Sequence, residues 1–317
     1  MELIRGLHNL RPSHNGCVAT IGNFDGVHLG HQAVIGQLAE EGQALGLPTL
    51  VMLFEPQPLE YFEPDYIPAR LTRFREKLRA LSRYAVDRVL VVRFNAEFAA
   101  LTAENFIRRI LVESLGVRYL VLGDDFHFGY KRRGNFEMLQ AAGREFGFKV
   151  INMHTFNIDG QRVSSTRIRE ALAAGDLAAA EKLLGRPYRM SGRVAHGDKR
   201  GRTIGIPTAN IHLHRKVTPV SGVYVVEMFG VKGEPVDGVA NVGTRPTVGG
   251  TRTLLEVHLL DFDQDIYGCH VNIDFLHKLR DEQRYDSFEA LKERIFLDID
   301  EACAWLRERD EKNKTTL

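Results

Sequence analysis

The chain has 317 residues, which is long enough for two domains that each bury a full hydrophobic core. Its 42 lysines and arginines nearly balance its 41 aspartates and glutamates, so the composition favours neither a nucleic acid nor an anionic membrane as a partner. The three cysteines, Cys17, Cys269 and Cys303, are widely separated and include no C-x-x-C pair, so they suggest neither a disulfide framework nor a zinc cluster.

No part of the sequence has the pattern of a membrane or export segment. The start of the chain lacks an apolar core followed by a cleavage site, and no later run approaches the roughly 18 apolar residues of a membrane span. We therefore expect a soluble, cytoplasmic protein with no membrane partner and no nucleic-acid partner. The sequence leaves the oligomeric state open.

Up to about residue 155, short β-branched runs alternate with amphipathic stretches. The runs are apolar through their middles, as parallel strands covered on both faces are. They predict strands at residues 18–21, 49–54, 88–92, 119–122 and 149–152. The stretches between them predict helices at residues 32–44, 73–84, 103–115 and 134–146. This alternation predicts a doubly wound α/β fold, whose ligands lie at the carboxyl ends of the parallel strands near the topological switch.

The most informative stretch directly follows the first of these strands. Residues 22–31 read GNFDGVHLGH, a glycine-rich turn that leads from a strand into a helix. Such a turn directs backbone N–H groups and the positive end of the helix at an anion. His28 and His31 can then donate hydrogen bonds to charge that develops on a phosphoryl group. The alternative is that both histidines are surface or capping residues of an ordinary turn.

Two further segments belong at the ends of the same sheet. Residues 123–129 read GDDFHFG and follow the fourth predicted strand, where an active-site loop is expected, although they also suit a packed aromatic turn. Residues 164–169 read SSTRIR and place hydroxyls and an arginine at a helix start. Serine and threonine are common N-caps, but their hydroxyls also suit the β- and γ-phosphates of ATP.

Beyond residue 164 the pattern changes. Two short alanine-rich helices are predicted at residues 165–174 and 177–184, before a Gly-Arg-Pro stop signal. A last helix, at residues 287–309, carries apolar residues at helical spacing and is expected only to pack. Between them, strands are predicted at close intervals, at residues 189–195, 223–229, 238–242, 254–261 and 270–275. The pattern predicts a small antiparallel β-barrel followed by a C-terminal helix, with domains at residues 1–185 and 186–317.

The barrel region contains a glycine loop that differs from a P-loop. Its glycines are one residue too close together, and Arg202 stands where a P-loop has lysine. A flexible glycine loop over a barrel mouth can still cover phosphates with its backbone N–H groups. Thr208 and Asn210 follow, and their oxygens suit Mg²⁺, although both residues are also common turn formers. The phosphate-binding candidates of the loop are Gly197, Lys199, Gly201 and Thr203.

Glu256 lies in the middle of a predicted strand among apolar neighbours. An ionised carboxylate is costly there unless it has a partner or a task. A structural interpretation pairs it with Arg245 or Arg252, because ion pairs often perturb carboxylates. The functional interpretation makes it a general base that takes a proton from a substrate hydroxyl.

These motifs carry a family resemblance that spans nearly the whole chain. The H-x-G-H of residues 28–31 resembles the signature of nucleotidylyltransferases, and the longer GNFDGVHLGH and SSTRIR strings look like bacterial FAD synthetase. The string GRTIGIPTAN at residues 201–210 resembles the riboflavin kinase signature, with Ile206 where the family has phenylalanine. The chain thus resembles the bacterial bifunctional riboflavin kinase and FMN adenylyltransferase family.

The resemblance implies that ATP phosphorylates riboflavin to FMN and that ATP then adenylylates FMN, giving FAD and pyrophosphate. It implies riboflavin, FMN and ATP as small-molecule partners and Mg²⁺ as a cofactor. His28 and His31 would stabilise the α-phosphate, and Glu256 would be the base of the kinase reaction. The implied binding residues are Gly22, Asn23, Phe24, Ser165, Thr166 and Arg167 for ATP, and Asp125, Phe126, Phe128, Arg245 and Thr247 for the flavin.

Two competing interpretations come from the same residues. One is an enzyme with a single activity and an accessory barrel, against which the intact P-T-A-N segment and Glu256 count. The other is a non-catalytic flavin-sensing module, against which His28 and His31 count. One departure from the family is Gln57, which stands where the family often has histidine and cannot take a proton.

Overall fold

The computed structural model describes residues 1–123, 126–153, 156–196, 205–215, 217–231, 233–247 and 250–316, and leaves the side chains of residues 244–252 and 315–316 undescribed. The chain forms two compact units. The first comprises Met1–Pro68 and Thr72–Ser165, and the second comprises Ala69–Leu71 and Thr166–Leu317.

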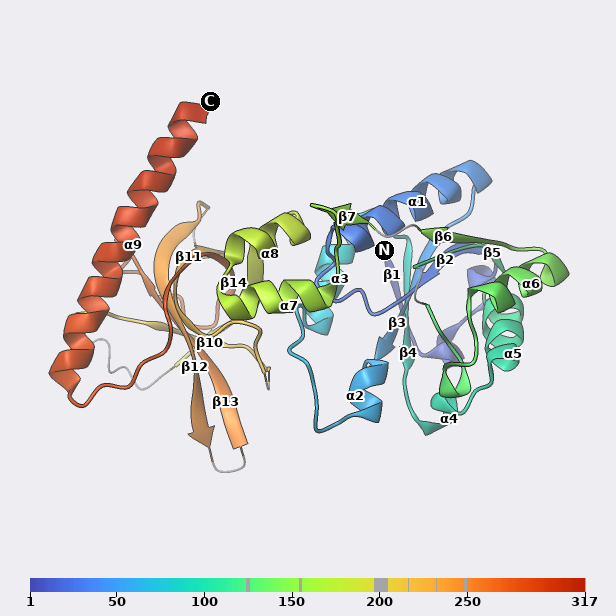
Figure 1. The fold of residues 1–317 in the computed structure, drawn as a ribbon, viewed down its shortest axis with the longest axis horizontal. Coiled ribbons are helices and arrows are strands. Elements are labelled where there is room, and N and C mark those ends of the chain that lie inside the picture. Colours follow the sequence, from blue (N-terminus) through green and yellow to red (C-terminus); the bar gives the residue numbers. More distant parts are fainter. Residues whose placement is uncertain are drawn as a thin grey trace. The chain divides into compact units, whose positions relative to one another are not determined.

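The first unit contains a six-stranded parallel sheet with strand order β1-β4-β3-β2-β5-β6 (Figure 1). The order reverses between β2 and β5, so the carboxyl ends of these two strands form the crevice where such sheets bind ligands. The α/β part of the predicted fold is confirmed. The strands are β1 Glu2–Arg5, β2 Cys17–Ile21, β3 Thr49–Glu55, β4 Arg88–Arg93, β5 Val117–Gly123 and β6 Lys149–Met153.

Helices connect these strands, and each of the four predicted from the sequence is present. The helix expected at residues 103–115 is divided into a short α-helix and a π-helix. The helices are α1 Leu29–Leu45, α2 Pro58–Phe62, α3 Phe74–Leu81, α4 Ala96–Ala99, α5 Ala103–Asn105, the π-helix η3 Phe106–Ser114 and α6 Phe136–Phe146. Smaller elements are the 3-10 turns η1 Leu7–Asn9, η2 Pro12–His14 and η4 Tyr130–Arg132, and the hairpin of β7 Asn157–Ile158 and β8 Gln161–Arg162.

Alternate residues of each strand pack into two separate cores, one on each face of the sheet. On one face, Met52 and Leu120 pack with Phe106 of the π-helix and Leu139 of α6. On the other face, β-strand residues pack with α1 and α3, including Ile35, Leu38 and Leu81. Burial on both faces explains why the strands are continuous apolar runs rather than alternating ones.

Sequence reasoning missed the edge strand β1, which pairs with β4 from Glu2↔Arg88 to Arg5↔Val91. Only Ile4 of this strand is buried. An edge strand with one buried residue lacks the apolar run that marked the internal strands, and therefore gave no signal.

The second unit contains a closed antiparallel barrel with strand order β10-β13-β12-β11-β14-β9 (Figure 1). The predicted barrel is confirmed, and the helices predicted at residues 165–174 and 177–184 have these bounds in the structure. The elements are α7 Ser165–Ala174, α8 Leu177–Leu184, β9 Tyr188–Ala195, β10 Ala209–His212, β11 Gly222–Phe229, β12 Val236–Thr247, β13 Gly250–Leu259, β14 His270–Arg280 and α9 Phe288–Thr316.

The short strand β10 was also missed, because its residues follow Pro207 in a string that suits a turn as well as a metal site. β10 pairs with β13 on one side and with β9 on the other. The barrel closes only through this strand, so four residues determine whether the sheet has open edges.

Helix α9 packs on the outside of the barrel, as its apolar spacing predicts. Ala302 and Leu306 contact a cluster that includes Val223, Val225 and Val239. Asp298, which is 2% exposed, binds Arg280 of β14 through both carboxylate oxygens, at 2.8 and 2.7 Å.

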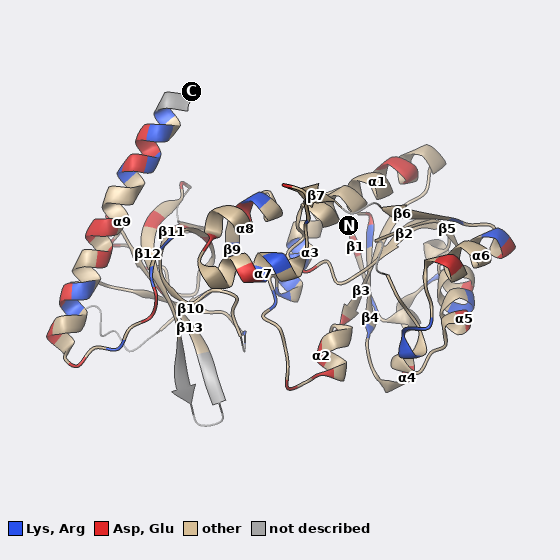
Figure 2. Ribbon diagram, in the orientation of Figure 1, with Lys and Arg blue, Asp and Glu red and all other residues tan. Residues whose placement is uncertain are grey.

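Helix α9 carries positive and negative residues interspersed along its length (Figure 2). Among the described residues, no helix has the length and apolar character needed to cross a membrane.

The packing of α8 predicts that it stabilises the barrel. Leu177, Ala180, Leu183 and Leu184 of α8 are buried, and α8 contacts β9 and β14. Burying one leucine side chain contributes about 1.5–3 kcal/mol. We therefore expect a fragment of residues 186–317 to unfold about 5 °C or more below a fragment of residues 166–317. Thermal unfolding followed by circular dichroism measures this difference, and equal midpoints would show that α8 adds nothing to barrel stability.

Candidate active sites

The histidine loop, which we define as residues 22–31, connects β2 to α1 at the crevice of the parallel sheet. His28 is the N-cap of α1, and its Nδ1 accepts a hydrogen bond of 3.3 Å from the backbone N–H of His31. The two imidazole rings stack with centroids 3.6 Å apart and planes at 16°. The structure therefore brings both predicted histidines together at the positive end of a 17-residue helix.

The hydrogen bond to Nδ1 determines which proton His28 carries. A neutral imidazole that accepts at Nδ1 has its proton on Nε2, so Nε2 is the donor nitrogen of the His28 ring. Burial, together with the charges of His28 and Lys77, holds the pKa of His31 well below its ordinary value. Nδ1 of His31 is buried and makes no hydrogen bond within the described residues. At neutral pH, His31 is therefore an uncharged group with an unpaired ring nitrogen.

Gly30 allows this arrangement of rings. A Cβ at position 30 would lie 3.3 Å from both Cε1 and Nδ1 of His28. The glycine of H-x-G-H thus makes room for the first histidine, in addition to the close ligand approach expected from the sequence.

The neighbouring candidates in the histidine loop differ in exposure. Gly22 directly follows β2 and Asn23 is exposed, as nucleotide-contacting residues need to be. Phe24 is 2% exposed, and its ring centroid lies 4.8 Å from that of His31. Phe24 therefore packs against the histidine from inside the unit.

A row of aromatic rings extends from the loop after β5 to α2. Phe126 is half-buried and Phe128 is buried, and Phe62 at the other end of the row is 62% exposed. Asp125, the third flavin candidate, lies outside the described residues. Centroids of successive rings lie 5.2 to 6.2 Å apart along Phe126, Phe128, Phe106, Phe98, Phe94 and Phe62.

Sequence reasoning named only two members of this row. The missed signal is Phe94, which directly follows β4 and therefore lies at the same carboxyl edge of the sheet. Phe126 and Phe128 stack with their planes at 18°, and the further pairs of the row are tilted or edge-on, at 44° to 86°. Aromatic pairs favour both arrangements, so the row is a packed apolar cluster.

The string SSTRIR begins helix α7 at Ser165, as predicted. Oγ of Ser165 donates a 2.9 Å hydrogen bond to the backbone oxygen of Asp25, within the histidine loop. Thr166 is exposed and Arg167 is half-buried. Ser165 thus contacts the histidine loop directly, whereas Thr166 and Arg167 belong to the second unit.

Gln57, the departure from the family, is 6% exposed and directly precedes α2. Its Nε2 is buried and makes no hydrogen bond within the described residues. A buried amide without a partner is costly, so this N–H₂ group is suited to donate to a bound ligand.

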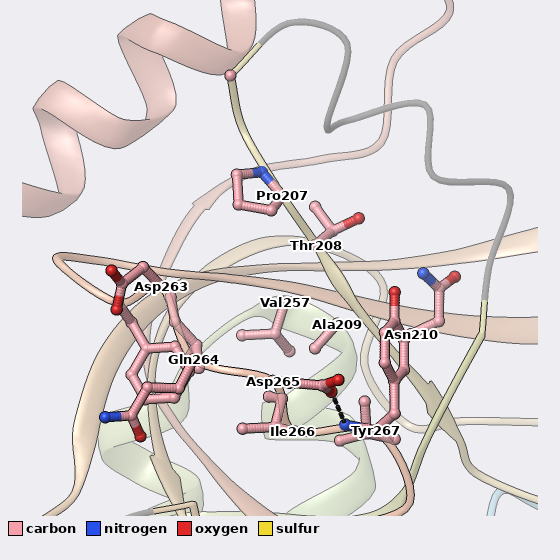
Figure 3. Close-up of a pocket in the computed structure, with 14 residues that line it drawn as sticks. Pro207, Thr208, Ala209, Asn210, Val257, Asp263, Gln264, Asp265, Ile266 and Tyr267 are labelled. Carbon is pink, nitrogen blue, oxygen red and sulfur yellow. Dashed lines mark hydrogen bonds between the residues drawn. The ribbon is translucent and has the colours of Figure 1, made fainter.

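In the barrel, a pocket of about 440 Å³ lies between the segment before β10 and the loop after β13 (Figure 3). Thr208 and Asn210, the two predicted metal ligands, both line it. His258 Nδ1 donates to the backbone oxygen of Pro207 at 2.9 Å and holds the segment in place. The volume falls in the range of small-ligand sites. The opposite wall comprises Phe262, Asp263, Gln264, Asp265, Ile266 and Tyr267.

Glu256 lies directly opposite Asn210 in the β10–β13 pair and directly opposite Asn241 in the β12–β13 pair. Its neighbours Leu255 and Val257 are fully buried in the barrel, whereas all three polar residues are half-buried. Opposed side chains in antiparallel strands have Cβ atoms about 4.5–5.5 Å apart. The carboxylate and the two amides therefore form one polar row on the outer face, and Asn210 belongs to both the row and the pocket.

Several barrel candidates cannot be placed. Gly197, Lys199, Gly201 and Thr203 lie outside the described residues, as do the side chains of Arg245 and Thr247. The same holds for Arg252, so the ion-pair interpretation of Glu256 is not tested.

The donor set of the barrel site suits a hard cation. Thr208 and Asn210 offer a hydroxyl and an amide oxygen, and Mg²⁺ prefers a few such oxygens together with substrate phosphates. No group of three or more histidines, cysteines, aspartates or glutamates that could hold a metal occurs among the described residues. The residues present therefore fit a magnesium ion that arrives with a nucleotide.

Known protein families match both parts of the chain. The chain matches the family model described as FAD synthetase over residues 10–167 and the one described as riboflavin kinase over residues 184–306. It is 57% identical over 299 residues to the bifunctional riboflavin kinase/FMN adenylyltransferase of Escherichia coli (strain K12), spanning 94% of this chain and 96% of that protein. The protein of the same name from Pseudomonas fluorescens is 53% identical over 305 residues, which cover 96% of this chain and 97% of that protein.

A solved structure shows the same fold. The crystal structure of a protein described as a macrolide-efflux protein from Streptococcus pneumoniae matches with a TM-score of 0.81 at 33% identity, and the match covers 95% of this chain and 98% of that chain. The resemblance inferred from the sequence motifs is thus confirmed over both units. The chain belongs to the bifunctional riboflavin kinase/FMN adenylyltransferase family.

Proposed function

We propose that this chain phosphorylates riboflavin to FMN and adenylylates FMN to FAD, each time with ATP, and that residues 1–185 and 186–317 carry adenylyl transfer and phosphorylation respectively. The observation that carries the proposal is the stacked pair of His28 and His31 at the start of α1. Two imidazoles that can donate hydrogen bonds at the positive end of a helix suit a phosphoryl group that gains negative charge in its transition state.

In adenylyl transfer, an oxygen of the FMN phosphate attacks the α-phosphorus of ATP, and the bond to pyrophosphate breaks. His28 and His31 donate hydrogen bonds to the α-phosphate, and Asn23 helps to orient it. Gly22 and Phe24 shape this site, with Phe24 packing behind His31. Ser165, Thr166 and Arg167 hold the leaving pyrophosphate. No general base is required, because the attacking phosphate oxygen is already anionic.

The aromatic row supports flavin binding at the same edge of the sheet. The isoalloxazine ring system is planar and has an apolar dimethylbenzene end, and Phe126 and Phe62 offer partly exposed rings. Phe128 is buried and packs against Phe126 from the inside. Asp125 is proposed on the resemblance alone.

In the kinase reaction, the terminal ribityl hydroxyl of riboflavin attacks the γ-phosphorus of ATP, and ADP leaves. Glu256 takes the proton from that hydroxyl, supported by its place beside Asn210. The pocket beyond Asn210 receives the nucleotide. The remaining proposed contacts are Gly197, Lys199, Gly201 and Thr203 to phosphate, and Arg245 and Thr247 to the flavin.

Thr208 and Asn210 would hold Mg²⁺, which when bound offsets the charge of the ATP phosphates. We propose no nucleic-acid partner, since 42 basic and 41 acidic residues produce no basic excess. We also propose a cytoplasmic location, which the free cysteines and the use of ATP favour.

The full chain, incubated with riboflavin, ATP and Mg²⁺, is expected to form both FMN and FAD, and chelation of the metal is expected to stop FMN formation. Chromatographic separation of the flavins measures both products. The 186–317 fragment, if folded, is expected to form FMN without FAD. Release of pyrophosphate from ATP and FMN separates an enzyme from a flavin-sensing module, and its absence would refute adenylyl transfer.

Replacing both His28 and His31 by alanine is expected to abolish FAD formation from supplied FMN while riboflavin phosphorylation continues. One lost donor to a developing oxyanion typically costs ~10² to 10³ in rate. His14→Ala is the matched control, because His14 is also buried but lies before β2, away from the histidine loop. Adenylyl transfer at the control rate in the double variant would remove the histidines from the mechanism.

Glu256→Gln is expected to lower FMN formation by ~10² to 10⁴ and to leave FAD synthesis from supplied FMN near the wild-type rate, because glutamine cannot accept a proton. The control is Glu227→Gln, which changes a half-buried glutamate on barrel strand β11, a strand that does not pair with β13. Steady-state rates with each flavin substrate measure the effect. If a folded Glu256→Gln variant phosphorylates riboflavin as fast as the control, Glu256 is structural.

A further inference from the structure

The backbone of the histidine loop is strained at two buried positions. Phe24 has a φ of 48° and Val27 a φ of 45°, in the left-handed region that L residues with bulky or branched side chains avoid. Their side chains are 2% and 1% exposed. A conformation of this kind persists only when the surrounding structure holds it, and such strain concentrates at functional sites.

Asp25, between these two residues, makes the contacts that hold the loop. It is 2% exposed, and its Oδ1 accepts hydrogen bonds from Thr72, at 2.9 Å from the backbone N–H and 3.2 Å from the hydroxyl. The Thr72 hydroxyl oxygen in turn accepts a 3.0 Å bond from the backbone N–H of Gly26. The carboxylate, the hydroxyl and the amide thus form a closed ring of hydrogen bonds. Neither Asp25 nor Thr72 was assigned a role from the sequence.

The ring joins segments that are far apart along the chain. Thr72 lies 47 residues beyond Asp25 and immediately before the N-cap of α3. The backbone oxygen of Asp25 accepts a further bond from Ser165, 140 residues away. The histidine loop is therefore anchored at its middle, while its end is anchored by the capping bond between His28 and His31.

We propose that Asp25 and Thr72 are positioning residues for adenylyl transfer, which hold the strained histidine loop so that His28 and His31 face the α-phosphate of ATP. This inference rests on the proposed function of the loop. Neither residue needs to touch the substrate.

The proposal predicts a loss in kcat rather than in substrate binding. Removing the Thr72 hydroxyl removes its hydrogen bonds to the N–H of Gly26 and to Asp25, so we expect Phe24 and Val27 to relax toward ordinary backbone angles. The imidazoles then shift relative to the reacting phosphate. A misplacement of ~1 Å can cost ~10²-fold in rate, whereas the rest of the binding surface is unchanged.

The test uses the full chain with Thr72→Val, which keeps the shape of threonine and removes its oxygen. We expect kcat for FAD formation from FMN to fall about 10- to 100-fold, with KM for ATP and FMN within about threefold of wild type. Thr72→Ser restores the hydroxyl and is expected to restore kcat.

Thr49→Val is the matched control. Thr49 is 4% exposed, as is Thr72, and its hydroxyl likewise bridges a carboxylate and an amide, those of Asp87. It lies at the start of β3, at the opposite edge of the sheet from the histidine loop. A kcat of Thr72→Val equal to that of Thr49→Val would overturn the proposal, and so would a change in KM alone.

If Thr72→Val does not fold, Asp25→Asn replaces it, with Asp87→Asn as its control. This change keeps the shape and an acceptor oxygen but removes the charge, so we expect a kcat loss of about threefold to tenfold. Equal rates for the two asparagine variants would refute the positioning role.

Hydrogen exchange, measured by mass spectrometry, tests this inference independently of the proposed function. We expect the amides of residues 22–31 to exchange faster in Thr72→Val than in Thr49→Val. A wild-type chain that forms no FAD from FMN would refute the proposed function, but exchange would still report on the loop. Unchanged exchange in Thr72→Val would show that the ring of hydrogen bonds does not hold it.

Discussion

The hydrogen bond from the backbone N–H of His31 to Nδ1 of His28 caps helix α1 and also orients the two histidines of the proposed adenylyl-transfer site. It places the proton of His28 on Nε2 and brings the two rings to 3.6 Å. Gly30 accommodates this stacking, because a Cβ there would lie only 3.3 Å from the His28 ring and the ring would have to shift. The glycine and both histidines of H-x-G-H thus serve one geometry, and the bonds of Asp25 hold the backbone that precedes it.

The barrel depends in a comparable way on β10. These four residues pair with both β9 and β13, and by closing the barrel they place Asn210 opposite Glu256. The pairing of β10 that closes the barrel therefore also forms the proposed kinase site. A loop at this position would leave two open sheet edges and would also separate Asn210, a proposed magnesium ligand, from the proposed base.

The two reactions require different chemistry, and the two units differ accordingly. A phosphate oxygen of FMN is already a nucleophile, so the site proposed in the first unit needs hydrogen-bond donors near the α-phosphate rather than a base. A ribityl hydroxyl must lose its proton, so the second unit needs a base, and it has a carboxylate beside an amide row. Neither proposed phosphate site has the sequence of a P-loop.

The sequence by itself determined the two folds, five of the six parallel strands and the family, because these strands are marked by apolar, β-branched runs and the motifs are long local strings. It did not reveal β1 or β10, which are four residues long and lack such a run. Only the tertiary structure decided that Thr72 holds Asp25 and that Phe62 joins the row of Phe126, because these contacts join segments separated by tens of residues. A hydrogen bond between distant segments depends on how the chain folds back, and no local pattern of residues records it.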